Sequence, residues 1–210
     1  MGAPESSSMP DHSKSLSAGS MRDLTEDYIE QRTIQRRPVT VAPRTDYRQA
    51  AVLVPLFRER DGWHVLFTRR TDNVQDHKGQ VSFPGGMAEP EDGSLEKTAL
   101  RETFEEIGIP AKKIRLVGRL DEFETISGYV ITPVCAFIDW PVDIHCNLDE
   151  VSRVFSIPLA WLAKPEHHST RQVSIRPGRL DEVLFFDKYD GELLWGITAR
   201  IMLRFLEILG

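Results

Sequence analysis

The segment GQVSFPGGMAEPEDGSLEKTALRETFEEIGI, residues 79–109, joins a glycine-containing loop to a helix-forming stretch that carries three glutamates within five positions. These are Glu102, Glu105 and Glu106. Like charges three or four positions apart repel each other and weaken a helix. A cation bound between the carboxylates would offset that repulsion, so the crowding itself suggests a ligand.

The helix is expected over about 94–107, where successive residues turn by about 100°. On that wheel the three carboxylates share one stripe. The apolar side chains fall on the opposite side, where we expect them to pack against a sheet: Leu100, Phe104 and Ile107. Mg²⁺ and similar hard cations bind carboxylate oxygens together with substrate phosphates and water. Arg101 lies beside the stripe and is in position to orient a glutamate. The alternative to a cation site is that the three glutamates form an ordinary solvated acidic face.

Strands and helices are expected to alternate around this segment. Residues 50–57 and 63–70 are typical of a hairpin that turns at Asp61-Gly62. Further strands are expected at 114–120, at 129–138 and twice within 171–187, with helices over 157–164 and 196–209. Asp92 or Ser94 is the candidate N-cap of the helix at 94–107, and Gly108 its C-terminal stop. The fold class is therefore α+β, with a mixed β-sheet flanked by helices.

The two ends of the chain differ from its middle. Residues 1–20 are rich in Ser, Pro and Gly and are expected to form a disordered tail. A helix is predicted in 21–37, with Leu24 and Tyr28 on one side. Residues 38–210 are assigned to the main domain, because a length of 210 residues suits one domain with extensions.

The composition excludes several classes of protein. The net charge is −6 and the chain has no dense Lys/Arg block, so broad nucleic-acid binding is disfavoured while a small phosphate-bearing ligand is not. Two cysteines in no CxxC arrangement favour a reducing compartment and argue against a structural zinc. No apolar run reaches membrane-spanning length and no signal peptide is recognisable, so the cytoplasm is the expected location. The choice between a monomer and a homodimer stays open.

Residues 79–109 resemble the signature of the Nudix hydrolases, G-x5-E-x7-R-E-U-x-E-E-x-G-U with U apolar. The half R-E-T-F-E-E-I-G-I matches it, with Thr103 where an aliphatic residue is usual. The upstream loop holds one additional residue, which leaves three candidates for the upstream acid: Glu89, Glu91 and Asp92. The resemblance implies an α/β/α sandwich and Mg²⁺ or Mn²⁺ on the three helical glutamates. It also implies hydrolysis of a nucleoside diphosphate derivative.

Residues 66–86, LFTRRTDNVQDHKGQVSFPGG, are similar to the L-L-T-x-R-S-x3-R-x3-G-x3-F-P-G-G motif of the coenzyme A pyrophosphatase branch. Gln75 replaces the second arginine of that motif. Residues 194–202, LWGITARIM, are similar to a W-G-x-T-A-R segment of the same branch, in which Trp195 and Thr198 are expected to be structural. The implied reaction cleaves coenzyme A, or an acyl derivative, to 3′,5′-ADP and 4′-phosphopantetheine.

The resemblance also assigns roles to residues. The expected substrate-binding residues are Arg70, Phe83, Gly85 and Gly86, although Phe83 also suits core packing and only one of the neighbours Arg69 and Arg70 should face the cleft. The expected catalytic residues are Glu106 or Glu150 as general base, with Arg101 as support. The alternative substrates are ADP-ribose, a nucleoside diphosphate sugar or an oxidised nucleotide. A catalytically silent nucleotide-binding domain is disfavoured because all three glutamates are present.

Overall fold

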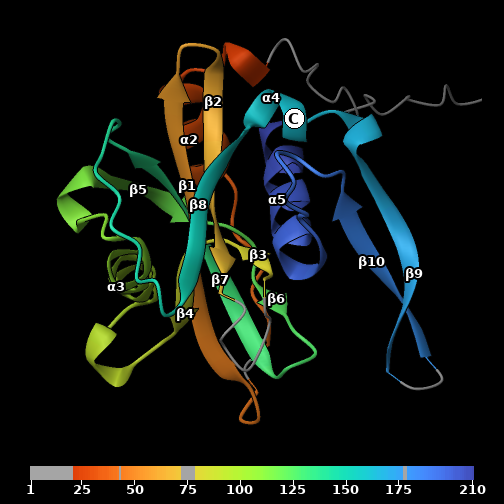
Figure 1. Cartoon of the computed structure of the whole chain (residues 1–210). Helices are drawn as coiled ribbons and strands as arrows, with labels where there is room; N and C mark the ends of the chain where they lie inside the picture. Colours follow the sequence, from red (N-terminus) through yellow and green to blue (C-terminus); the bar gives the residue numbers. More distant parts are fainter. Residues whose placement is uncertain (1–20, 43, 72–78, 177–178) are drawn as a thin grey trace, which may run out of the picture.

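The computed structural model describes residues 21–42, 44–71, 79–176 and 179–210 (Figure 1). The predicted disordered tail at 1–20 and the substituted position Gln75 lie outside the described residues.

A mixed sheet forms the centre of the molecule (Figure 1). Its strand order is β3-β2-β1-β7-β5, with β4 paired to β1, β8 to β2 and β6 to β7. β1 runs parallel to β7, and the other pairs are antiparallel. The strands are β1 (Arg48–Glu59), β2 (Gly62–Arg70), β3 (Val81–Ser82), β4 (Gly85–Met87), β5 (Ile114–Arg119), β6 (Phe123–Glu124), β7 (Tyr129–Ile138) and β8 (Val151–Pro158).

Helices cover both faces of this sheet, as the alternation of side chains along β1 requires. Ala51 and Leu53 pack with Ala99 of α3 (Leu95–Ile107) on one face. Val54 and Leu56 point to the other face, into the larger core shared with α2 (Glu26–Ile34) and α5 (Gly196–Leu209). Figure 1 shows α3 and α5 on opposite sides of the sheet. The predicted α+β fold, an α/β/α sandwich, is confirmed.

The remaining elements agree closely with the sequence predictions. The first hairpin forms, but its turn consists of Arg60 and Asp61, because Glu59 already pairs with Gly62. The short helix is α4 (Leu159–Leu162). The two late strands, β9 (His168–Arg176) and β10 (Arg179–Phe186), form a separate antiparallel ribbon that extends from the body beside α5 (Figure 1).

The N-terminal helix is shorter than the predicted segment 21–37, because Thr25 caps it at the Tyr28 amide and it ends at Ile34. It packs against the end of the chain, where the Tyr28 hydroxyl donates to the Leu209 carbonyl at 2.9 Å. Among the described residues, none of the helices combines the length and the apolar content that crossing a bilayer demands.

The helix α3 has the predicted ends. Ser94 is its N-cap and accepts a hydrogen bond from the Lys97 amide at 3.3 Å. Gly108 ends it with φ of +73°, a left-handed conformation that favours glycine.

The predicted packing face of α3 is confirmed at Ile107 but wrong at Phe104. Phe104, expected against the sheet, is 56% exposed, whereas Ala99, Thr103 and Glu106 are buried together with Ile107. The small side chains of Ala99 and Thr103 let the helix approach β1 and β4 closely. The Thr103 hydroxyl stays satisfied there by donating to the Ala99 carbonyl at 2.6 Å. The rotation directs two of the three glutamates inward instead of away from the sheet.

Candidate catalytic pocket

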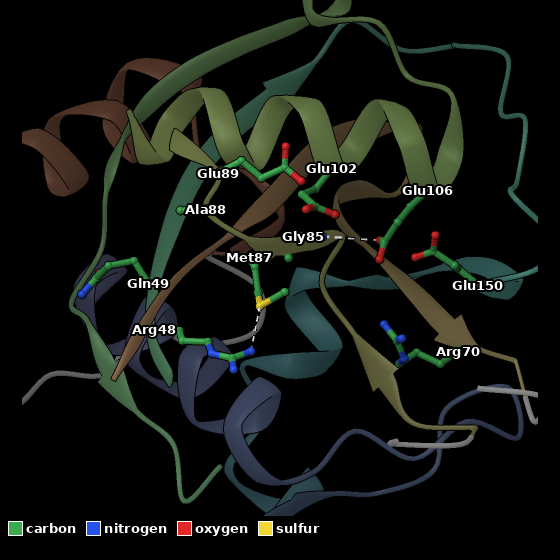
Figure 2. A pocket seen from close by; sticks show the side chains of 11 residues that line it. Arg48, Gln49, Arg70, Gly85, Met87, Ala88, Glu89, Glu102, Glu106 and Glu150 are labelled. Carbon is green, nitrogen blue, oxygen red and sulfur yellow. Dashed lines mark hydrogen bonds between the residues drawn. The ribbon is translucent and has the colours of Figure 1, made fainter. Parts of the chain in front are cut away.

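A cavity of about 520 Å³ opens where α3, β4, β1, the end of β2 and the loop before β8 meet (Figure 2). It is lined by four carboxylates, those of Glu89, Glu102, Glu106 and Glu150. Two arginines, Arg48 and Arg70, lie on opposite sides of it (Figure 2). The pocket therefore combines oxygen donors for a cation with guanidinium groups for an anion.

The glycines of β4 set how closely the helix approaches this pocket. A Cβ atom at Gly86 would lie 2.5 Å from the carboxyl carbon of Glu102. At Gly85, where φ is +153°, a Cβ would lie 2.4 Å from the Ala51 carbonyl oxygen. Gly85 thus excludes a side chain because backbone atoms lie against it, whereas a side chain at Gly86 would displace the Glu102 carboxylate.

Glu106 is the most deeply placed carboxylate of the pocket. It is only 3% exposed, and its Oε2 lies 3.4 Å from the Gly85 amide, which donates to it. Burial raises the pKa of Glu106 to about 8, although the Arg70 guanidinium opposes the shift. Burial also raises the pKa of Glu102, against the effect of Arg101. The charges of Glu102 and Glu150 raise the pKa of Glu106 further, so these carboxylates repel one another.

Glu150 reaches the pocket from a different part of the chain. The Asn147 amide donates to the Glu106 carbonyl at 2.9 Å, which fastens the loop before β8 to the end of α3. The Asn147 side chain then donates to Glu150 Oε1 at 3.2 Å. The structure therefore brings Glu150 beside Glu106, as Figure 2 shows.

Only one of the two neighbouring arginines faces the pocket, as expected for a strand. Arg70 lines it, and its buried Nε has no hydrogen-bond partner among the described residues. Arg69 points elsewhere, with Nη1 at 3.3 Å from the Ser152 hydroxyl. An unpaired buried donor costs free energy, so the Arg70 site favours an anion that would accept from it.

Arg101 supports the site from outside the pocket. Its Nε and Nη2 donate to the two oxygens of Asp92 at 2.8 and 3.0 Å, and Nη2 also donates to the Met87 carbonyl at 2.9 Å. Its Nη1 donates to Glu102 and to Glu105, both at 2.9 Å. Arg101 thus orients Glu102 and ties α3 to β4 without lining the pocket.

Of the three candidates for the upstream acid, Asp92 is the partner of Arg101. Its carboxylate is buried and also accepts from the Thr98 hydroxyl at 2.8 Å and the Glu89 amide at 2.9 Å. These contacts, Arg101 first among them, hold the pKa of Asp92 well below its usual range. Glu89 lines the pocket instead, and Glu91 is exposed.

Two other predicted site residues do not join the cluster. Glu105, expected as a metal ligand, is 52% exposed at its side chain and turns toward Arg101. Phe83, expected at the substrate, is buried in the core with its ring 4.9 Å from that of Phe67. Thr198 has the expected structural role, since its hydroxyl donates to the Val81 carbonyl at 3.2 Å.

The pocket also contains residues that the sequence predictions missed. Arg48 and Gln49 begin β1, two positions before the predicted start of that strand, and Met87 ends β4. Arg48 would have been found by extending the strand backward, because Arg48 alternates in step with Ala50 and Val52.

The donors suit a divalent cation, but they are not gathered around one point. Among the described residues, no three His, Cys, Asp or Glu side chains form a ready-made metal cluster. Glu102, Glu106 and Glu150 nevertheless line one cavity and repel one another, which a cation would relieve. Glu105, the third predicted ligand, contacts Arg101 instead of lining this cavity.

The sandwich fold is shared with MutT/nudix proteins of known structure. A solved structure of this kind, a MutT/nudix family protein from Enterococcus faecalis, superimposes with a TM-score of 0.53 at 18% identity and covers 84% of this chain and 71% of that one. The NUDIX domain model matches residues 47–188, and the chain belongs to the Nudix family.

Two curated relatives agree with this assignment, and both are named "Uncharacterized Nudix hydrolase NudL". The protein from Yersinia enterocolitica is 35% identical over 158 residues, 75% of this chain and 80% of the relative. The protein from Photorhabdus laumondii is 35% identical over 176 residues, 84% and 92% of the two chains. The protein is thus a Nudix hydrolase, a kind of enzyme that acts on nucleoside diphosphate derivatives and generally uses divalent metal ions.

Proposed function

We propose that the protein hydrolyses the diphosphate of coenzyme A, or of an acyl derivative, to 3′,5′-ADP and (acyl-)4′-phosphopantetheine. The observation that carries the proposal is the pocket itself. It places three mutually repelling carboxylates against a glycine strand and opposite the unpaired Nε of Arg70. The substrate assignment is supported by the motif of residues 66–86, because the residues of that motif supply both Arg70 and the β4 glycines.

Glu102 and Glu106 would hold Mg²⁺ or Mn²⁺, with Glu150 beside them in the pocket. Such an ion would neutralise the diphosphate oxygens and lower the pKa of water. Arg101 keeps Glu102 turned to the pocket, and the glycines of β4 leave room for a phosphate close to the backbone.

The reacting atoms are handled by the protein's own side chains. Arg70 donates to a phosphate oxygen and fixes the diphosphate beside the carboxylates. Water attacks one phosphorus while the bond from that phosphorus to the bridging oxygen breaks, which leaves two phosphate monoesters. We assign the general base to Glu150, because its side chain reaches the pocket from the loop before β8 and is only half-buried, whereas Glu106 is enclosed.

The substrate is tested by product analysis. We expect mass spectrometry to find 3′,5′-ADP and 4′-phosphopantetheine from coenzyme A with Mg²⁺, and neither product with a chelator. ADP-ribose and nucleoside diphosphate sugars are the competing substrates, since they share the diphosphate. Equal or faster cleavage of ADP-ribose would refute the coenzyme A assignment. No cleavage of any compound would favour the silent nucleotide-binding domain.

A further inference from the structure

Arg48 lies at the end of the pocket away from Glu106 (Figure 2), and no described carboxylate forms an ion pair with it. Among the described residues, the hydrogen-bond partner of its guanidinium is the Met87 sulfur, 3.8 Å from Nη1. A thioether is a weak acceptor, so most of the hydrogen-bonding capacity of Arg48 is unused. Glu89 also lines the pocket, but no ion pair joins it to Arg48 within the part of the chain that the structure describes.

The surroundings of Arg48 suit one half of a nucleotide. Met87 is 47% exposed and offers a polarisable apolar surface to a planar base. The Tyr129 hydroxyl lies 3.6 Å from the Met87 sulfur, and Tyr129 is the register partner of Arg48 on β7. This end of the pocket therefore presents a thioether and a guanidinium side by side, with the Tyr129 hydroxyl against the thioether.

The strand register separates Arg48 from the carboxylates. Val52 of β1 is opposite Gly85, whose amide contacts Glu106, and Arg48 is four residues further along the strand. At about 3.3 Å per residue, the backbone of Arg48 lies about 13 Å from that level. Figure 2 likewise places Arg48 and Arg70 on opposite sides of the pocket. The two phosphates of a diphosphate share one bridging oxygen, so a diphosphate held by Arg70 and the carboxylates leaves Arg48 for another group.

We propose that Arg48 binds a further phosphate monoester on the nucleoside half of the substrate and so selects nucleoside diphosphate derivatives that carry a third phosphate. The inference rests on the proposed function, because coenzyme A carries such a group at the 3′ position and dephospho-coenzyme A does not. It deepens that function by assigning the discrimination between these two compounds to one residue. A planar guanidinium suits the task because its donors match two phosphate oxygens at once.

The test compares kcat/KM for coenzyme A and dephospho-coenzyme A in the wild type, Arg48→Ala and Arg48→Lys. We expect Arg48→Ala to lower kcat/KM for coenzyme A by about 10- to 100-fold, mainly through KM, because a charge-assisted contact is lost. The value for dephospho-coenzyme A should fall much less, and Arg48→Lys should keep part of the preference. Arg44→Ala is the matched control, since Arg44 is exposed, paired with Asp46 at 2.8 Å and outside the pocket.

Two outcomes overturn the inference: a wild type that does not prefer coenzyme A over dephospho-coenzyme A, or a preference that survives Arg48→Ala. Failure of the proposed function has a different signature, namely cleavage of ADP-ribose with neither coenzyme cleaved. In that case the role of Arg48 is tested by comparing two inhibitors of ADP-ribose cleavage: 3′,5′-ADP, which carries the additional phosphate, and 5′-AMP, which lacks it. Stronger inhibition by 3′,5′-ADP that is lost in Arg48→Ala supports the inference, and equal inhibition refutes it.

Discussion

The three helical glutamates differ in their surroundings, although Arg101 contacts two of them. Its Nη1 contacts both Glu102 and Glu105, but only Glu102 lies against Gly86 at the pocket wall. Glu105 is one position before the enclosed Glu106 and so projects toward solvent. The spacing of the glutamates predicted a cation site, but it did not show which of them Arg101 holds outside.

We therefore expect Glu102→Gln and Glu105→Gln to differ. Glu102→Gln should lower kcat by 10²-fold or more, on the order of an electrostatic contact to the reacting phosphate. Glu105→Gln should lower it by less than about tenfold, because one interaction with a side chain that is half exposed contributes little. The two variants are matched controls, since each removes one carboxylate from Arg101. Initial rates at saturating Mg²⁺ distinguish them, and an equally large loss in Glu105→Gln would place Glu105 among the metal ligands.

For helix α3, the sequence predicted both ends but not the face that packs against the sheet. Ser94 and Gly108 are local signals whose effect depends on adjacent backbone groups, so the ends were predictable. The packing face depends on a distant partner, the glycine strand β4, which admits a helix with small residues. The apolar pattern predicted that Phe104 would pack against the sheet. Instead the buried residues are Ala99 and Thr103, whose small side chains let the helix lie close to β4. Glu150 was proposed only from a resemblance, because its place beside Glu106 depends on the loop contact made by Asn147.

The turn before α3 contributes to stability through the ion pair between Asp92 and Arg101. Asp92→Asn keeps the shape of the side chain but removes the charge that Arg101 contacts with two nitrogens. Since hydrogen bonds to charged groups contribute about 1.5–3 kcal/mol, the melting temperature should fall by about 3–10 °C for a chain of this size. Glu91→Gln, at the exposed acid one residue earlier, should stay within about 0.5 kcal/mol of the wild type. Thermal denaturation measures both, and equal stabilities of the two variants would contradict the role of Asp92.

Across the whole molecule, the buried carboxylate of Glu106 makes stability depend on pH and on metal together. Its pKa is raised from 4.5 to about 8 by burial, so the folded protein without metal holds a proton that the unfolded chain has released between these values. The contribution of Glu106 to stability is therefore fully present below about pH 4.5 and is lost as the pH rises through about 8. A bound cation requires the ionised form and should reverse that loss.

We expect melting temperatures in a chelator to reveal this linkage by comparison with Glu106→Gln. The glutamine cannot ionise, so its stability relative to the wild type should rise between about pH 5 and pH 8, by about 7–14 °C in melting temperature. Adding Mg²⁺ or Mn²⁺ at pH 8 should stabilise the wild type by about 2.7 kcal/mol when the ion is at 100 times its Kd, and should stabilise Glu106→Gln far less. Glu105→Gln is the control and should follow the wild type in both experiments. A constant difference between wild type and Glu106→Gln across this pH range would show that Glu106 is ionised in the metal-free protein, and an equal response of both to metal would exclude Glu106 as a ligand.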